Sequence, residues 1–309
     1  IAKLRMQAEA LRFDVVLSPD DMDRSHILAQ IAGAATAAAL AEISARVHLD
    51  LSATTDDRPF FFNQLMPLDP ASIALASSRA DGVVRGNGFA TMTLLLIVIL
   101  SGMLVVYTML VPTLPTLNQA PAALARMGTF YFLLIGLGFM FVEIGLIQRI
   151  SIFLGHPVYG LAFGLFGIIV STGAGALFSD RMPIASGSRI VVWTTALGLY
   201  LALLPFWLPV AIAAFEGSSL VERAALSLAV VAPCGFLMGF GFPAGVPLVN
   251  AIDSTPTPWF WADNGASGVL AASLAVATSI AFSINASLWV GAACYLAIGP
   301  VGMALAALP

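Results

Sequence analysis

The sequence predicts an all-α, polytopic membrane protein with about seven transmembrane helices, preceded by a small α/β segment. Its mean hydropathy is +0.94, and hydrophobic residues make up 59% of the 309 residues. Charged residues make up only 10%, whereas they form about a quarter of a typical soluble domain. From residue 89 onward, apolar segments recur that are long enough to cross a hydrocarbon layer about 30 Å thick.

The first 85 residues carry most of the charges and therefore form a polar N-terminal tail. They hold 8 of the 13 basic and 11 of the 17 acidic residues. We accordingly divide the chain into a tail domain over 1–66, a linker over 67–88 and a transmembrane domain over 89–309. Because the first residue is Ile1, we expect the chain to be the later part of a longer polypeptide.

The tail begins with the alternation of helix and strand that is typical of an α/β sheet. Apolar residues in the first eleven positions fall on one helical face, and the β-prone run Phe13–Leu17 follows them. One such unit cannot close a core alone. Residues Met22–Val47 then predict one long helix or two helices joined near Gly33, with Asp21 or Asp23 as the N-cap.

A turn follows at Thr54–Pro59, in which Asp56, Asp57 and Arg58 precede the proline. Short polar side chains accept hydrogen bonds from nearby backbone N–H groups, and proline fixes φ and ends regular structure. We expect either a structural turn, held by an Asp–Arg pair and an aromatic plug of Phe60–Phe62, or a ligand-binding turn.

The seven apolar segments define the expected transmembrane helices. They are Phe89–Val111, Gly128–Ile150, Tyr159–Phe178, Ile190–Phe215, Ala224–Val249, Gly265–Phe282 and Ala286–Leu308. Only Ser283–Asn285 separates the last two segments, so these form either a tight hairpin or one kinked element.

The second segment contains one ionisable side chain within its apolar run, Glu143. A carboxylate near the bilayer centre costs about 2.5–3.5 kcal/mol on insertion scales, so Glu143 should face other helices or water and have a partner. Gln148, Arg149 and His156 lie near the end of the same helix, and together with Glu143 they form a candidate intramembrane polar site. The alternative is that Glu143 is a structural hydrogen-bonding group that stays protonated in apolar surroundings.

Proline and glycine interrupt the fifth segment in the run GFLMGFGFPAGVPL. Pro233, Pro243 and Pro247 each remove a backbone donor. Broken helices that line a cavity in transporters have this composition, and so do helices that are merely kinked. Three GxxxG spacings in the third and fifth segments allow close approach of helices.

Polar and aromatic residues mark the start of the sixth segment. Trp259 and Trp261 suit a membrane interface, and Asp263 and Asn264 form a candidate second polar cluster. One interpretation is an interface anchor followed by a helix N-cap. The other places Asp263 and Asn264 beside Glu143 in the lining of a shared cavity.

The arginines give little indication of the orientation in the membrane. If the tail lies inside, the inner flanks carry Arg79, Arg85, Arg149 and Arg223, and the outer flanks carry Arg126, Arg181 and Arg189. Four against three is a small bias by the positive-inside rule. This topology also places Asp263 and Arg149 near opposite faces, so we do not expect them to pair.

Composition also excludes some classes of function. The net charge of −4 does not provide the basic face that nucleic-acid binding needs. The three histidines have no neighbours at metal-ligand spacing, so we expect no metal site. Cys234 and Cys294 lie in apolar runs and are expected to be buried thiols.

Three motifs of this chain resemble those of bacterial membrane proteins that carry a spermidine-synthase-like domain, a polyamine aminopropyltransferase-like fold, fused to transmembrane helices. The motifs are Asp56–Phe61, Glu143–Arg149 and Trp261–Gly265. In that family the first closes the soluble domain, the second lies in a phenylalanine-rich helix, and the third opens a late helix. The motifs occur here in the same order, and the resemblance covers nearly the whole chain.

The resemblance implies that residues 1–66 are the C-terminal remnant of a Rossmann-like domain. It also implies a multi-pass protein of the bacterial inner membrane with a cytoplasmic tail. The family's glycine-rich adenosyl-binding turn is absent between Ile1 and Leu65. We therefore expect neither catalytic residues nor a cofactor in this chain alone, and an S-adenosyl-type ligand would require an upstream domain.

Three functions follow as hypotheses. The first is a non-catalytic membrane anchor or accessory half of a spermidine-synthase-like protein, with an upstream catalytic domain as its partner. The second is a scaffold subunit that binds other membrane subunits. The third is a transporter of a small cation such as a polyamine, with Glu143 as the counter-charge.

Overall fold

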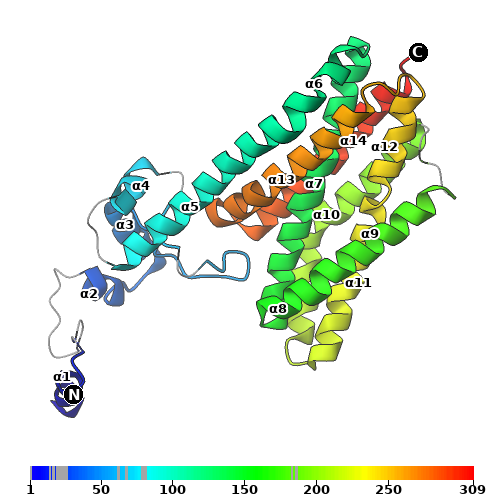
Figure 1. The fold of residues 1–309 in the computed structure, drawn as a ribbon. Coiled ribbons are helices and arrows are strands. Elements are labelled where there is room, and N and C mark those ends of the chain that lie inside the picture. Colours follow the sequence, from blue (N-terminus) through cyan, green and yellow to red (C-terminus); the bar gives the residue numbers. More distant parts are fainter. Residues whose placement is uncertain are drawn as a thin grey trace. The chain divides into compact units, whose positions relative to one another are not determined.

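The computed structural model of the protein, drawn in Figure 1, describes residues 2–13, 15, 18, 27–60, 63–66, 69–77, 82–181, 184 and 187–309. The chain divides into two compact units. Unit 1 comprises Ile1–Thr54 and Phe61–Phe89, and unit 2 comprises Thr55–Phe60 and Ala90–Pro309. The short segment Thr55–Phe60 therefore belongs with the transmembrane helices and not with the tail on either side of it.

Unit 1 contains short helices in its described residues. Thr36 starts one of them, because its hydroxyl accepts a hydrogen bond of 3.2 Å from the N–H of Ala39. The same helix ends at His48, which adopts a left-handed conformation with φ of 54°. The helices are α1 (Ala2–Ala10), α2 (Ile27–Ala32), α3 (Ala37–Val47) and α4 (Pro70–Ser77).

The chain returns to the end of α3 after the turn. The N–H of Asp50 donates to the carbonyl oxygen of Gln64 at 2.7 Å, and Leu49 pairs with Leu65 in an isolated antiparallel bridge. Leu65 is buried, as is Ile43 of α3. The segment that follows the turn is thus paired with the residues directly after α3.

The α/β remnant expected over residues 1–66 is not seen among the described residues. They contain helices, turns and isolated bridges, and no strand. Most of the β-prone run Phe13–Leu17 lies outside the described residues, as do the candidate N-caps Asp21 and Asp23. The helical stretch up to Val47 is divided into α2 and α3 at Gly33–Thr36, which agrees with the alternative of two helices.

The linker expected over residues 67–88 is partly helical. Asp69 caps α4, because its carboxylate accepts a hydrogen bond of 2.9 Å from the N–H of Ala71. Pro70 occupies the first position of α4, where its missing N–H costs nothing. The first transmembrane helix then begins at Gly82.

From Gly82 onward, seven helices of the described chain are long and apolar enough to cross a membrane. The protein is therefore a multi-pass membrane protein, and the expected number of spans is confirmed. The elements are α5 (Gly82–Val105), η1 (Val106–Leu110), α6 (Val111–Asn118), α7 (Ala122–Leu154), α8 (Pro157–Tyr159), η2 (Gly160–Leu165), α9 (Phe166–Ser179), α10 (Gly187–Phe215), α11 (Leu220–Met238), α12 (Gly241–Asn250), α13 (Thr257–Ala281) and α14 (Ile284–Ala306).

Several spans are longer than the sequence predicted. The first is one continuous helical run from Gly82 to Asn118 through α5, η1 and α6, and the second runs from Ala122 to Leu154. The first extends beyond the expected bounds Phe89–Val111 at both ends, and the second extends beyond Gly128–Ile150 at both ends. The π-helical elements η1 and η2 were not expected from the sequence.

Helix α7 is central to the transmembrane bundle, as Figure 1 shows in green. It packs along its length against α13 and α14 and also contacts η2, α11 and α12. Of its apolar window, 56% is buried, compared with 6% for the first span. Gly155 ends α7 in a left-handed conformation with φ of 78°.

Close approach of α9 and α11 depends on residues without side chains. A Cβ atom on Gly175 would lie 2.0 Å from the carbonyl oxygen of Phe236, and one on Gly235 would lie 2.0 Å from the hydroxyl of Ser171. Both distances are far below van der Waals contact. The GxxxG spacing that begins at Gly235 therefore serves helix packing, as expected.

The fifth span is interrupted at Gly239–Phe240, between α11 and α12. Position 243 is proline, so the carbonyl of Gly239 lacks a helical N–H donor four residues on. Two aromatic side chains bind backbone carbonyls around the break. Trp193 Nε1 donates to Leu237 at 2.7 Å and Tyr131 Oη donates to Gly241 at 3.0 Å.

The last two spans form a tight hairpin and not one kinked helix. α13 ends at Ala281, and Ser283 starts α14 by accepting a hydrogen bond of 3.1 Å from the N–H of Ala286. The two helices are also joined by Ser287, whose hydroxyl is 2.9 Å from that of Ser279. Both serine side chains are fully buried.

Candidate functional site

The turn Thr55–Phe60 reaches the transmembrane bundle and forms the first part of the candidate site. Thr55 and Arg58 exchange backbone hydrogen bonds, with the N–H of Arg58 donating to the carbonyl of Thr55 at 2.9 Å. The hydroxyl of Thr55 accepts a second hydrogen bond from the same N–H at 3.2 Å. This closed turn presents Asp56 and Asp57 at its tip. Of the aromatic plug, Phe61 and Phe62 lie outside the described residues.

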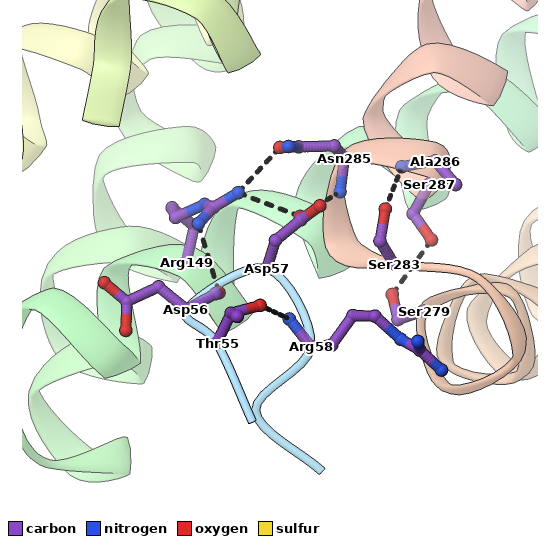
Figure 2. A network of polar contacts seen from close by, with 10 residues as sticks. All are labelled: Thr55, Asp56, Asp57, Arg58, Arg149, Ser279, Ser283, Asn285, Ala286 and Ser287. Atoms are coloured by element: carbon purple, nitrogen blue, oxygen red, sulfur yellow. Dashed lines mark hydrogen bonds and ion pairs between the residues drawn. The ribbon is translucent and has the colours of Figure 1, made fainter. Parts of the chain in front are cut away.

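Arg149, near the end of α7, binds the turn (Figure 2). Its Nη1 donates to the backbone carbonyl of Asp56 at 3.1 Å, and its Nη2 donates to Asp57 Oδ1 at 3.0 Å. Nη2 also donates to Asn285 Oδ1 at 2.6 Å. Arg149 is only 5% exposed, so these oxygens replace the water that a guanidinium would otherwise bind.

Asp57 also caps the first turn of α14. Its Oδ1 accepts a hydrogen bond of 2.8 Å from the N–H of Asn285, and its carbonyl oxygen accepts one of 3.0 Å from the N–H of Ile284. The first N–H groups of a helix have no intrahelical acceptor. A carboxylate there also interacts favourably with the helix dipole. Asp57 thus accepts hydrogen bonds both from a buried arginine and from the N-terminus of a helix.

The sequence singled out both partners of this ion pair but assigned them to separate sites. Asp57 was placed in the domain-closing turn with Asp56 and Arg58, and Arg149 in the intramembrane site with Glu143. The structure brings Asp57 and Arg149 together although they are 92 positions apart. Asn285, which the sequence interpretation treated only as part of a turn, completes the network.

Glu143 does not bind the partners expected on its own helix. Its side chain is buried, with 8% of the residue exposed. Gln148 and Arg149 follow five and six positions later, whereas neighbours on one helical face are three or four positions apart. Arg149 binds the turn, and Gln148 Oε1 is buried without a hydrogen bond among the described residues.

His156 acts as a local helix cap. Its Nδ1 accepts a hydrogen bond of 3.2 Å from the N–H of Val158 at the start of α8. Its ring lies 5.8 Å from that of Tyr159, measured between centroids. The side chain is exposed and does not join Glu143 in one site.

Asp263 and Asn264 lie inside α13, which corrects their expected role as its cap. The helix begins at Thr257, about two turns before Asp263. Pro258 lies in its first turn, where proline is favoured because a backbone N–H is not needed there. Asp263 is 5% exposed and its Oδ2 is buried without a hydrogen bond among the described residues. Trp259 binds Thr129 of α7 through a hydrogen bond of 2.8 Å.

A cavity of about 780 Å³ lies beside the interruption of the fifth span. Its walls come from α7, α9, the α11–α12 break and α13. Among the described residues, Asn264 and Thr172 provide its hydrogen-bonding side chains, and no charged side chain lines it. Asn264 thus lines this cavity, whereas Asp263 and Glu143, which one interpretation of the sequence placed with it, are not among the lining residues.

The described residues contain no group of three or more His, Cys, Asp or Glu side chains that could hold a metal ion. Cys234 and Cys294 are buried free thiols, as expected.

No protein-family model, curated protein or solved structure matches this chain.

Proposed function

We propose that this chain is the non-catalytic membrane-anchoring and accessory half of a spermidine-synthase-like membrane protein. The observation that supports anchoring is the position of Thr55–Phe60. This segment lies within the polar tail in the sequence, yet it belongs to the compact unit formed by the transmembrane helices. A turn held in this way fixes the tail to the bundle at a second point besides the continuous chain at α5.

The contacts of the turn are suited to such a role. Arg149 and the N-terminus of α14 belong to two different helices, and both bind Asp57. Breaking the pair would leave a buried guanidinium without its carboxylate, which is costlier than losing an exposed ion pair. Removing either partner alone should therefore cost more than removing one partner of an exposed ion pair.

The orientation and partner belong to the same proposal. Arg149 and Arg223 lie at the end of the bundle that binds the turn, and Arg223 donates to the carbonyl of Phe153 at 3.1 Å. Counted with Arg79 and Arg85, which precede the first span in the sequence, this end carries four arginines against three at the other, a small bias towards the cytoplasmic side of a bacterial inner membrane. A catalytic domain that binds an S-adenosyl-type ligand would then be joined upstream of Ile1 and held at the membrane.

A cleavage experiment tests the anchoring. A protease site is inserted at positions 78–81 of the full chain, and membranes containing the protein are treated with protease until cleavage is complete. The fragment that ends before α5 then has no covalent link to the transmembrane helices. We expect it to stay in the membrane pellet, because the turn still binds Arg149 and α14.

Matched variants distinguish this attachment from other causes of retention. Asp57→Asn combined with Arg149→Gln should release most of the fragment into the supernatant. Asp56→Asn should release much less, because Asp56 binds Arg149 through its backbone carbonyl. Release of the wild-type fragment, or equal retention by the double variant, would contradict the proposal.

A scaffold subunit is the second candidate, and the packing of the first span favours it. Only 6% of the apolar window of that span is buried, and large side chains such as Leu96, Ile99 and Leu104 are exposed on it. Co-purification of stoichiometric membrane partners that bind this helix would support a scaffold role.

Transport of a small cation has less support. The cavity beside the fifth span is lined by no acidic side chain among the described residues, and Glu143 lies elsewhere on α7. A cation in the membrane requires a counter-charge. Unchanged uptake by Glu143→Gln in reconstituted vesicles would count against this function.

A further inference from the structure

A second cavity, of about 620 Å³, lies between the first half of α10 and the break of the fifth span. It shares no described lining residue with the cavity of about 780 Å³. Its volume lies within the usual range of about 300–1,000 Å³ for ligand sites. Unlike the larger cavity, it is lined by charged side chains, those of Arg181 and Arg189.

The two arginines lie at the same end of the bundle. Arg181 follows the last residue of α9, Ser179, and Arg189 lies in the first turn of α10, so both flank one short connection. Both residues are exposed. No acidic side chain is among the described residues that line the cavity, although Asp180 is adjacent in the sequence.

The position of Arg189 strengthens the attraction of this end for an anion. The N-terminus of a helix carries a partial positive charge that favours anions and disfavours cations. The first turn of α10 contains no acidic residue and does contain this arginine. The helix end and the two guanidinium groups therefore contribute charge of the same sign.

The lining further along α10 is apolar. Val192, Trp193 and Ala196 follow Arg189 by three, four and seven positions, so all four residues lie along one face of the helix. These positions lead from the end of the span into its apolar part. Trp193 Nε1 already donates to the carbonyl of Leu237, so the indole offers no further N–H donor.

Aromatic residues of the fifth span complete the apolar lining. Phe236 and Phe240 both line the cavity, and their ring centroids are 5.3 Å apart. The ring of Phe236 also lies 5.9 Å from that of Phe178, over which the guanidinium of Arg181 lies at 5.5 Å. The cavity thus combines a cationic end beside the limit of the span with apolar walls inside it.

We propose that this cavity binds an anionic phospholipid, with its headgroup phosphate at the arginine end and an acyl chain along the apolar walls. Arginine suits phosphate oxygens because its guanidinium presents several N–H donors in one plane. An alkane would not use the arginines, and a free phosphate ion would not use the apolar walls. The site lies at the other end of the bundle from the Arg149–Asp57 network, so it does not depend on the anchoring function.

Native mass spectrometry of the full chain, purified in detergent, tests the proposal. Phosphatidylglycerol and phosphatidylcholine with identical acyl chains are titrated separately, and the Kd of the first bound lipid is measured. The two lipids share the phosphate and the chains and differ in net charge. We expect phosphatidylglycerol to bind with a Kd about fivefold lower or less, since each arginine near a lipid surface contributes about that factor.

Arginine variants locate the site. Arg181→Gln and Arg189→Gln should each raise the Kd for phosphatidylglycerol about fivefold and change that for phosphatidylcholine less. Arg126→Gln is the matched control. Arg126 is an exposed arginine near the start of α7, at the same end of the bundle, and it does not line the cavity.

Two further measurements distinguish a lipid from a free anion. Ala196→Phe fills the apolar part of the cavity from an exposed position and should raise the Kd for both lipids. Inorganic phosphate in excess should not displace phosphatidylglycerol. Displacement by phosphate, together with unchanged binding by Ala196→Phe, would identify a phosphate site and overturn the assignment to a lipid.

The Tm of each variant without added lipid separates loss of binding from loss of folding. Arg181, Arg189 and Ala196 are all exposed, so we expect their variants to unfold near the wild-type temperature. If one arginine variant does not fold, the other carries the test. Equal Kd values for the two lipids, unchanged binding by the folded arginine variants, or an equal loss in Arg126→Gln would overturn the proposal.

Discussion

The guanidinium of Arg149 and the carboxylate of Asp57 lie 3.0 Å apart, although the two residues are separated by 92 positions in the sequence. The arginine side chain is 5% exposed and the aspartate side chain is 32% exposed. Asp57 thus lies at the edge of the bundle, and Arg149 lies inside it. The pair joins the turn Thr55–Phe60 to α7, and Asn285 extends the network to α14.

Helix packing provides a prediction with an internal control on α9. Gly175→Ala should lower the free energy of unfolding by about 1–3 kcal/mol, because the added methyl group would overlap the backbone of α11. Gly173→Ala, two positions away, meets no atom within 4 Å and should be neutral or stabilising by up to about 1 kcal/mol. Reversible unfolding in mixed micelles compares the two variants. Equal effects would contradict the close packing of α9 and α11.

The two ionisable groups of α7 should respond differently to neutralisation. Glu143→Gln should leave the unfolding midpoint unchanged or raise it, because the buried carboxyl forms no hydrogen bond with another described residue. Arg149→Gln should lower the midpoint, because it removes the charged donor that binds Asp57 and the carbonyl of Asp56. Thermal unfolding in detergent measures both. A larger loss for Glu143→Gln would show that Glu143 has a structural partner.

The tail should lose a local contact at low pH. The hydrogen bond of 2.8 Å with His48, together with the N–H of Ala71, holds the pKa of the Asp69 carboxyl below its ordinary value. The ionised Asp69 carboxylate therefore contributes fully to stability above the pKa of the unfolded state, near 3.8. This contribution is lost as the pH falls through the lower pKa of the folded state.

Hydrogen exchange over residues 63–77 checks this pH dependence. After correction for intrinsic rates, wild type should be better protected than Asp69→Asn at pH 6, and the difference should shrink below pH 4. A difference that persists at the lowest pH would mean that the carboxylate charge is not responsible.

The number of spans could be predicted because an apolar segment long enough to cross the hydrocarbon layer can be recognised from its own length and composition. The extra turns of α7 and the π-helical segments could not, since they depend on packing and on backbone hydrogen bonds that hydropathy ignores. The position of Asp263 and Asn264 was misjudged for a related reason. Thr257 and Pro258 start α13 earlier than the apolar run does.

The candidate site was predictable in its parts but not in its assembly. The turn Asp56–Arg58 and the arginine at the end of α7 were recognised as unusual polar groups in the sequence. Their pairing depends on contacts between distant segments, for which composition and spacing give no signal. Asn285 could have been noticed as a polar residue at the start of an apolar segment, following a serine able to cap the helix.

A double-mutant cycle on Asp57 and Arg149 tests the central claim, that this pair fixes the tail to the transmembrane bundle, most directly. The free energy of unfolding is measured for wild type, Asp57→Ala, Arg149→Ala and the double variant, with Asp56→Ala and Arg149→Ala as the reference cycle. We predict a coupling energy of about 1–3 kcal/mol for Asp57 and Arg149, and a smaller one for the reference pair. Effects that add to within about 0.5 kcal/mol for Asp57 and Arg149 would contradict the account.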